Sequence, residues 1–139
     1  MKPSRKLDAL IAEKIMGYKV RWIEDGTIQK RLTPEIYSPP HGITTQFTYW
    51  LECPFYSTDI AAAFNIVDKM KDNDNKSNSW GFSWNFELCY MEQDHGPGQE
   101  WSAILHGPNT YQEGLATTPA MAICLAALSA MEIKLEDSE

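Results

Sequence analysis

Two stretches of the chain place hydroxyl side chains where a helix is expected to begin. "YSTDIAAA" covers residues 56–63 and "ATTPAMAIC" covers residues 116–124. A helix start presents unpaired backbone N–H groups at the positive end of the helix dipole, and both features favour an anion such as phosphate. One hydroxyl is enough to cap a helix, so a plain cap is the simpler interpretation of each stretch. The sequence leaves both interpretations open: a cap, or half of an anion site.

We define a set of candidate ligand-binding residues around these two helix starts. The hydroxyls and their backbone amides are expected to hold a phosphate or a ribose, and a carboxylate at the same end accepts a ribose hydroxyl but competes with a phosphate. Tyrosines beside the helix starts are expected to stack on a base, and arginines on or near the first hairpin balance its charge. The set is Tyr56, Ser57, Thr58, Asp59, Thr117, Thr118, Tyr111, Arg21, Arg31 and His106. The alternative for the tyrosines is packing at the rim of the core.

Other chemistries have weaker support in the sequence. The three histidines, His41, His95 and His106, lie in or beside loops, and no serine stands in a G-x-S-x-G turn. Turnover of a cyclic nucleotide would need a base such as His41 or His106 close to the phosphate. The stretch "EQDHG" at residues 92–96 offers possible metal ligands, but the Gly-Pro-Gly run beside it suits a solvated loop tip better. We therefore expect no catalytic residue, no metal and no cofactor.

The composition limits the classes of protein to which this chain can belong. The chain has 139 residues and a net charge of −7, and 43% of its residues are hydrophobic, which suits one compact domain over residues 1–139. A duplex DNA or RNA binder needs a basic face, so that class is disfavoured. Three dispersed cysteines form no disulfide framework and are expected to be buried free thiols. Neither a signal peptide nor a membrane span is evident, so we expect a cytoplasmic protein.

The hydrophobic pattern predicts helices and strands in a definite order. The first half reads as a helix over 4–16, hairpin strands over 18–23 and 27–32 around Asp25-Gly26, a proline-rich loop over 33–42 and a strand over 43–52. A second helix follows to residue 70, with Ser57 or Thr58 as its cap. Short turns between neighbouring strands favour a largely antiparallel sheet with helices packed against it.

The second half of the chain contains the strongest strand pattern. In "WGFSWNFELCY", residues 80–90, large apolar side chains alternate with small or polar ones and predict one broad apolar face. A long polar hairpin loop, a returning strand over 101–107 and a loop over 108–118 are expected next. Thr118-Pro119 then predicts the start of a helix that is apolar on almost every side and hence deeply buried.

Three segments together resemble a known family. They are "LDALIAEKIMGY", "YSTDIAAAFNIVDKM" and "ATTPAMAICLAALSAM", in this order along the chain. They resemble the phage ABA sandwich domain, found in small proteins of phages and prophages of Gram-positive bacteria. The resemblance implies an α+β fold, an α/β/α layered sandwich with a mostly antiparallel sheet and helices on both faces. The first hairpin and the 33–42 loop are enlarged relative to the family pattern, so a ligand specific to this protein could be framed there.

The resemblance and the candidate residues lead to two hypotheses from different classes. The first is a non-enzymatic, homo-oligomeric anti-defence protein that sequesters a small nucleotide-derived immune signal, of the cyclic nucleotide or cyclic ADP-ribose type, in the cytoplasm of the infected bacterial host cell. The alternative is a protein–protein interaction module that inhibits a host protein or serves as an oligomeric phage accessory protein. Ligand-dependent melting separates the two, because only the first predicts it.

Overall fold

The structure is a computed structural model that describes residues 2–24, 26, 28, 31–38, 49–71, 85–90, 99–107 and 110–131. Along these residues the helices and strands alternate in small groups. Their order is α1 (Arg5–Lys14), β1 (Val20–Glu24), β2 (Leu32–Ser38), β3 (Tyr49–Glu52), α2 (Ile60–Lys71), β4 (Asn85–Tyr90), β5 (Trp101–Gly107), β6 (Thr110–Ala116) and α3 (Pro119–Ala130). Among the described residues, no helix combines the length and apolar character needed to cross a membrane.

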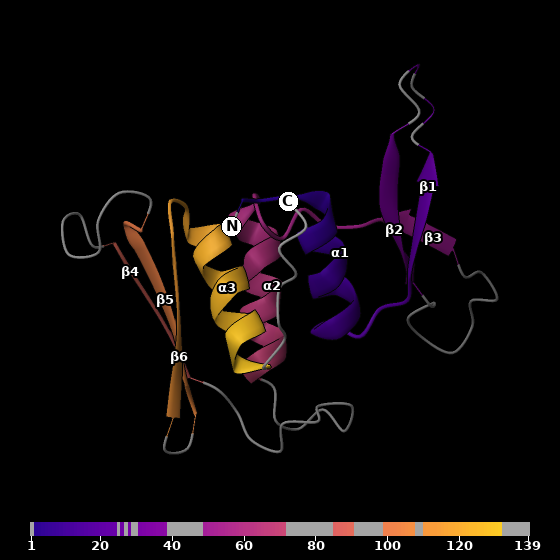
Figure 1. Ribbon diagram of the computed structural model, residues 1–139. Coiled ribbons are helices and arrows are strands. Elements are labelled where there is room, and N and C mark those ends of the chain that lie inside the picture. The colour runs from indigo at the N-terminus through magenta and orange to yellow at the C-terminus, as the bar shows by residue number, and fades with distance from the viewer. Residues whose placement is uncertain are drawn as a thin grey trace.

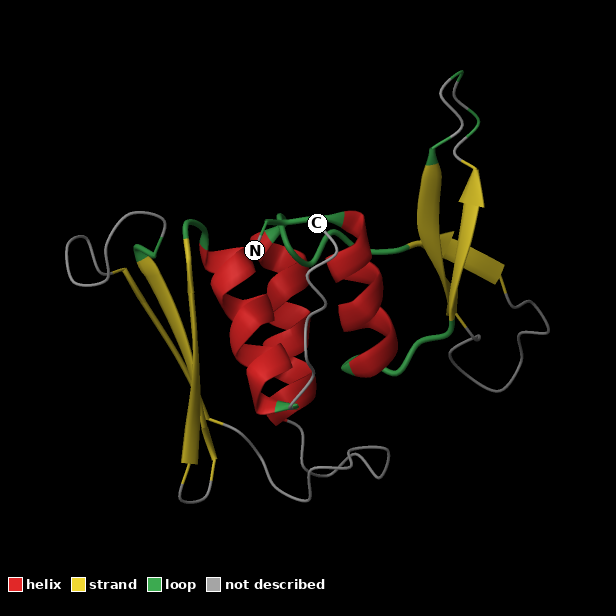
Figure 2. Cartoon of the chain, viewed as in Figure 1, coloured by secondary structure: helices red, strands yellow, loops and turns green. Residues whose placement is uncertain are grey.

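The strands form two separate antiparallel sheets, and the helices lie between them (Figure 1). The N-terminal sheet has the order β1-β2-β3 and contacts α1, whereas the C-terminal sheet has the order β4-β5-β6 and is covered by α3. All three helices run in the same direction, with their N-terminal ends together at the top of the view, as the colouring by secondary structure also shows (Figure 2). The predicted α+β sandwich class and the antiparallel pairing are confirmed. The single sheet covered on both faces is replaced by two sheets that flank one helical layer.

The helix boundaries follow the signals in the sequence. The Ser4 hydroxyl accepts the Leu7 N–H at 3.1 Å and caps α1, and Gly17 beyond its end has the predicted positive φ, +81°. Thr118 caps α3 by accepting the Met121 N–H at 3.2 Å, and Pro119 opens that helix. Most of α3 is buried, as its almost uniformly apolar sequence predicts.

The N-terminal sheet includes a segment that we expected to be a loop. β2 covers residues 32–38, and Pro34 is buried within it, opposite Trp22 of β1. The Pro34 carbonyl accepts the Cys53 N–H at 3.1 Å, so the missing proline N–H also faces the side where β3 has already ended at Glu52. A proline cannot return a hydrogen bond to the Cys53 carbonyl, but Arg5 Nη2 donates to that carbonyl at 2.6 Å, which explains why a proline is tolerated inside this strand. Of the predicted hairpin arm over 27–32, Leu32 lies in β2, Ile28 and Arg31 do not belong to a strand, and residues 27, 29 and 30 lie outside the described residues.

The C-terminal sheet packs against α3 at unusually close range. A side chain on Gly114 of β6 would place its Cβ 2.2 Å from the Ala122 carbonyl oxygen and 2.5 Å from the Ala126 nitrogen. Glycine on the strand and alanines on the helix therefore let the two backbones meet. The predicted loop over 108–118 is wrong, because 110–116 form β6 in register with β5.

The aromatic strand is confirmed over its described part. Phe86 and Leu88 of β4 lie partly buried against the core, and the Phe86 ring meets Phe64 of α2 edge-on with centroids 6.0 Å apart. The Tyr90 ring packs against Trp101 of β5, at 5.2 Å between centroids. Residues 80–84 of the predicted strand and the possible metal ligands at 92–96 lie outside the described residues.

Candidate functional site

The first helix start is a structural junction and not an open anion site. Tyr56 has only 1% of its surface exposed and Ser57 none, so neither side chain can stack on or bind a ligand at the surface. Burial raises the pKa of the Tyr56 phenol, which stays neutral. The predicted cap is also wrong: Asp59 caps α2, and its Oδ1 accepts the Ala61 N–H at 3.0 Å. The carboxylate thus occupies the positive end of α2 that a phosphate would need.

A buried ion pair holds this junction against α1. The Asp8 carboxylate, 1% exposed, accepts a hydrogen bond from Arg5 at 2.7 Å and another from the Ser57 N–H at 2.7 Å. Arg5 also donates to the carbonyl oxygens of Cys53 (2.6 Å) and Pro54 (3.3 Å) and lies 3.7 Å from the centre of the Phe55 ring. The polar groups at the start of "YSTD" are therefore satisfied by α1, and the stretch serves to join the helices.

The second helix start remains at the surface. Thr117 and Thr118 are exposed, and the Thr118 hydroxyl is used as the cap of α3. Thr58 is exposed as well, but its backbone N–H donates to the Phe55 carbonyl at 3.1 Å. Each helix start is thus a cap first, as the simpler interpretation proposed.

Two more of the predicted residues meet on the outer face of the C-terminal sheet. Tyr111 stands directly opposite His106, with ring centroids 6.3 Å apart, and His106 Nε2 lies 3.5 Å from a Glu87 carboxylate oxygen. Ser102 on the same face donates to Glu113 at 2.6 Å. Two carboxylates make this surface acidic, which disfavours a phosphate. Within the described ranges, no group of three or more His, Cys, Asp or Glu side chains is placed to hold a metal ion.

A cluster of cations and aromatic rings covers the outer face of the N-terminal sheet. Arg21 donates through Nε and Nη2 to Glu35, at 2.9 and 2.8 Å, and its guanidinium lies 4.3 Å from the centre of the Trp50 ring. Trp50 packs edge-on against Tyr37 at 5.3 Å, and the Lys19 ammonium lies 5.8 Å from the Tyr37 ring. We call these five residues the cation–aromatic cluster. It presents fixed positive charge beside π surfaces.

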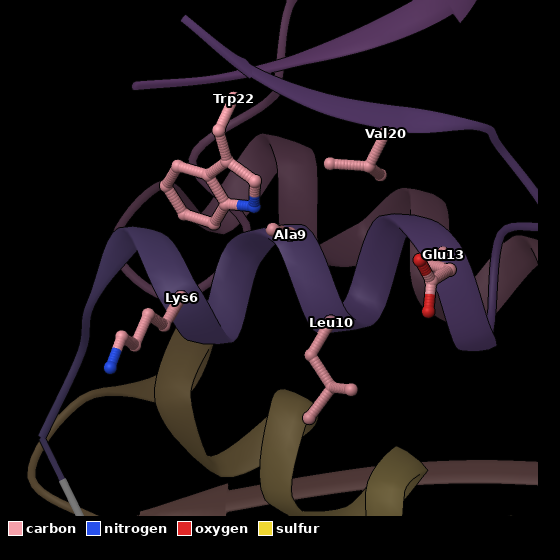
Figure 3. A pocket seen from close by; sticks show the side chains of 6 residues that line it. All are labelled: Lys6, Ala9, Leu10, Glu13, Val20 and Trp22. Carbon is pink, nitrogen blue, oxygen red and sulfur yellow. The ribbon is translucent and has the colours of Figure 1, made fainter. Parts of the chain in front are cut away.

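The inner side of the same sheet borders a hollow. A cavity of about 300 Å³ opens between α1 and β1, and Figure 3 shows the side chains around it. Ala9 forms its floor, with Trp22 and Val20 reaching over from β1. Lys6 and Glu13 stand at its two ends. The lining residues are Lys6, Ala9, Leu10, Glu13, Val20 and Trp22.

The ten predicted residues therefore do not form one site. They are divided among three parts of the molecule (Figure 1). These are the start of α2, the outer face of the C-terminal sheet, and the N-terminal sheet, where Arg21 lies in β1 and the exposed Arg31 precedes β2. The residues missed were Lys19, Glu35, Tyr37 and Trp50, which the structure places on the same sheet face as Arg21. Alternation in "YKVRWI" already put Lys19 and Arg21 on one strand face, but the pairing with Glu35 and Trp50 depends on tertiary register.

Cys53 and Cys124 lie where their thiols are unreactive. Burial raises the pKa of Cys53 to about 11, and burial also raises the pKa of Cys124, whose Sγ donates to the Tyr56 carbonyl at 3.3 Å. A protonated, buried thiol is a poor nucleophile. Cys53, Cys89 and Cys124 are all free, as predicted.

Comparison with known proteins places the chain in a family. The profile of the phage ABA sandwich domain matches residues 9–128. The chain belongs to the phage ABA sandwich domain family. It is also similar to the crystal structure of a phage protein from Bacillus cereus ATCC 14579, with 26% sequence identity, a TM-score of 0.60 and coverage of 98% of this chain and 93% of that one. Comparison with curated proteins finds no match. The match supports a phage protein with this fold.

Proposed function

We propose that this phage ABA sandwich protein is a non-enzymatic anti-defence protein that sequesters a small nucleotide-derived immune signal on the outer face of its N-terminal sheet. The observation that carries the proposal is the cation–aromatic cluster. Arg21 is held over Trp50 by Glu35, and Tyr37 and Lys19 extend the same surface. Aromatic rings stack on bases and fixed cations attract phosphates, so this pairing suits a nucleotide better than an apolar ligand.

The position of the cluster supports a ligand particular to this protein. Four of its five residues lie on the first hairpin and the 33–38 segment, which the sequence pattern predicts to be enlarged relative to the family. The chain as a whole carries a net charge of −7, whereas on this face Lys19 and Arg21 balance Glu35 and Glu52, which stand opposite each other in the register of β2 and β3. The Arg21 Nε and Nη2 atoms are engaged by Glu35, and the remaining guanidinium N–H groups are left for an acceptor on the ligand.

Native mass spectrometry with a panel of cyclic nucleotides and cyclic ADP-ribose isomers tests the proposal. We expect the wild type and Tyr111→Ala to retain a ligand mass, and Arg21→Ala and Trp50→Ala to lose it. Tyr111→Ala is the matched control, because it removes an exposed aromatic ring from the other sheet. The proposal is wrong if no member of the panel is retained. Release of a ligand with an altered mass after incubation would indicate turnover in place of sequestration.

A second candidate function is a protein–protein interaction module. It is favoured by exposed apolar side chains on the N-terminal sheet, where Trp22 and Leu51 are each 42% exposed and Leu32 is 62% exposed. Surfaces of this kind often mark protein contacts. This candidate predicts no shift in melting temperature with any nucleotide of the panel and a stoichiometric complex with a purified host protein. A nucleotide-dependent rise in melting temperature would count against it.

A further inference from the structure

We infer that Glu52 reads the base of the ligand on the outer face of the N-terminal sheet and selects guanine, so that the sequestered signal is a guanine nucleotide. The inference rests on the proposed function, because it assigns the ligand of the same site. It starts from the register of β1, β2 and β3, which sets Arg21, Glu35 and Glu52 side by side in one row across the sheet. The cations of this face account for attraction of a phosphate, but they leave the second carboxylate of the row unexplained.

Only one of the two carboxylates has a partner of opposite charge in the chain. Arg21 donates two hydrogen bonds to Oε1 of Glu35, at 2.9 and 2.8 Å. Glu52 is exposed, and within the described part of the chain no cation pairs with it. Like charges directly opposite each other on neighbouring strands destabilise a sheet. A ligand that donates hydrogen bonds to Glu52 would relieve this repulsion.

Glu52 stands next to the surface on which a base would stack. It shares a face of β3 with Trp50, because side chains two residues apart on a strand point the same way, and the two residues are about 7 Å apart. The Arg21 guanidinium lies 4.3 Å from the centre of the Trp50 ring, and bases stack on guanidinium planes as they do on aromatic rings. A base on this platform therefore brings one edge within reach of the Glu52 carboxylate.

The remaining cation of the cluster sets the direction of the ligand. Lys19 immediately precedes β1, and its carbonyl accepts the Tyr37 N–H at 2.9 Å, so it lies at the edge of the sheet opposite β3. Its ammonium lies 5.8 Å from the centre of the Tyr37 ring. A nucleotide that lies across the three strands thus meets Lys19 with its phosphate and Glu52 with its base.

A carboxylate distinguishes the bases by the groups on their Watson–Crick edges. It only accepts hydrogen bonds, through two oxygens that lie side by side. Guanine presents two adjacent donors, N1–H and the N2 amino group, which match both oxygens. Adenine and cytosine place a ring-nitrogen acceptor beside their amino group, and the single N–H of uracil lies between two carbonyl oxygens. Each of these three bases sets a lone pair against the carboxylate, so Glu52 favours guanine.

Isothermal titration calorimetry with cyclic di-GMP, cyclic di-AMP and cyclic di-IMP tests the inference, because the three ligands share one backbone and differ only on the Watson–Crick edge of the purine. We expect the wild type to bind cyclic di-GMP about tenfold or more tightly than cyclic di-AMP. Cyclic di-IMP, which lacks the N2 amino group, should fall between them.

Glu52→Gln should weaken binding of cyclic di-GMP about tenfold and shift the preference toward cyclic di-AMP, because an amide offers one donor and one acceptor, the pattern that matches adenine. Glu24→Gln is the matched control. It makes the same change in β1 on the other face of the same sheet and should leave all three affinities unchanged. Circular dichroism of each variant confirms that it is folded.

Two results would overturn the assignment of guanine and leave sequestration standing. One is equal affinity of the wild type for cyclic di-GMP and cyclic di-AMP, and the other is a Glu52→Gln variant that binds cyclic di-GMP as tightly as the wild type. If none of the three ligands binds, the guanine assignment is wrong, and retention of a cyclic ADP-ribose isomer in the mass-spectrometry panel shows whether sequestration survives. If Arg21→Ala binds as the wild type does, the site itself is wrong and both proposals fail.

Discussion

The N-terminal and C-terminal sheets have the same number of strands and the same antiparallel order, yet they are stabilised differently. In the C-terminal sheet, Gly114 brings the α3 backbone into direct contact, and Ala103 and Leu105 of β5 are buried beneath it. In the N-terminal sheet, α1 covers only part of the inner face, and Trp22 and Leu51 remain 42% exposed. One sheet is built into the core and the other stands at its edge.

The difference in packing indicates that the sequences of the two sheets are under different constraints. Close packing leaves little room for a substitution on the inner face of the C-terminal sheet, so the sequence of that face is constrained by stability. The N-terminal sheet contributes few residues to the core, and its two faces carry the cation–aromatic cluster and the charged hollow. Surfaces with low packing demand can vary to suit a ligand or partner without loss of the fold. Four predictions follow from the structure, ordered from the largest expected effect on stability to the smallest.

The largest effect is expected for Gly114→Val. A Cβ at this position overlaps backbone atoms of α3, which cannot move as a flexible side chain would, so we expect a loss of about 4 kcal/mol in unfolding free energy or no folded protein. Gly26→Ala is the matched control in the N-terminal sheet connection. Its Cβ meets open space, and its φ of +79° alone should cost about 1 kcal/mol. Urea unfolding measures both, and equal effects would refute the comparison.

Asp8→Ala should cause the second-largest loss in unfolding free energy. It leaves Arg5 and the Ser57 N–H without their buried carboxylate partner, and we expect a loss of about 3 kcal/mol. Glu35→Ala removes the carboxylate from the other arginine pair, which lies on the surface of the N-terminal sheet, and should cost less than about 1 kcal/mol. Urea unfolding of the two variants measures the loss in unfolding free energy for each. A larger loss for Glu35→Ala would show that the outer face stabilises the fold.

The same residue type can be compared in the two sheets. Leu105→Ala leaves a cavity beneath α3, because Leu105 is 1% exposed, and should cost about 2.5 kcal/mol. Leu32→Ala in β2 removes a side chain that is 62% exposed and should change stability by less than about 0.5 kcal/mol. Thermal unfolding by circular dichroism resolves the difference. Similar melting temperatures would mean that Leu32 is covered in solution.

The smallest effect concerns pH. Burial raises the pKa of Cys53 from 9.0 to about 11, so the folded state holds its proton more tightly than the unfolded state. The resulting stabilisation is fully present below about pH 9 and is lost as the pH rises toward 11. Between about pH 8.5 and pH 10.5, the wild type should lose about 2 kcal/mol more than Cys53→Ala, as measured by urea unfolding at each pH. An equal loss in both proteins would contradict the burial of this thiol.

Local sequence signals predicted the helices well and the strands only in part. Ser4, Gly17 and the Thr118-Pro119 pair marked helix ends correctly because capping depends on residues within one turn. The loop predictions were wrong over 33–38 and 110–116, since strand identity depends on a partner. Pro34 is compatible with β2 because Arg5 donates to the Cys53 carbonyl that a proline cannot reach with an N–H, and Gly114 suits β6 because α3 approaches it closely.

By itself, the sequence determined the three helices and the burial of Cys53 and Cys124, because periodicity, capping and apolar content are local properties. Its resemblance to the phage ABA sandwich domain pointed to the family and the α+β class. Only the tertiary structure decided which side chains are accessible and which meet. It placed Tyr56 and Ser57 in the core, split the strands into two sheets and brought Lys19, Arg21, Tyr37 and Trp50 onto one surface. Side-chain exposure and contacts across strands depend on register and packing between segments far apart in the chain, which no local pattern specifies.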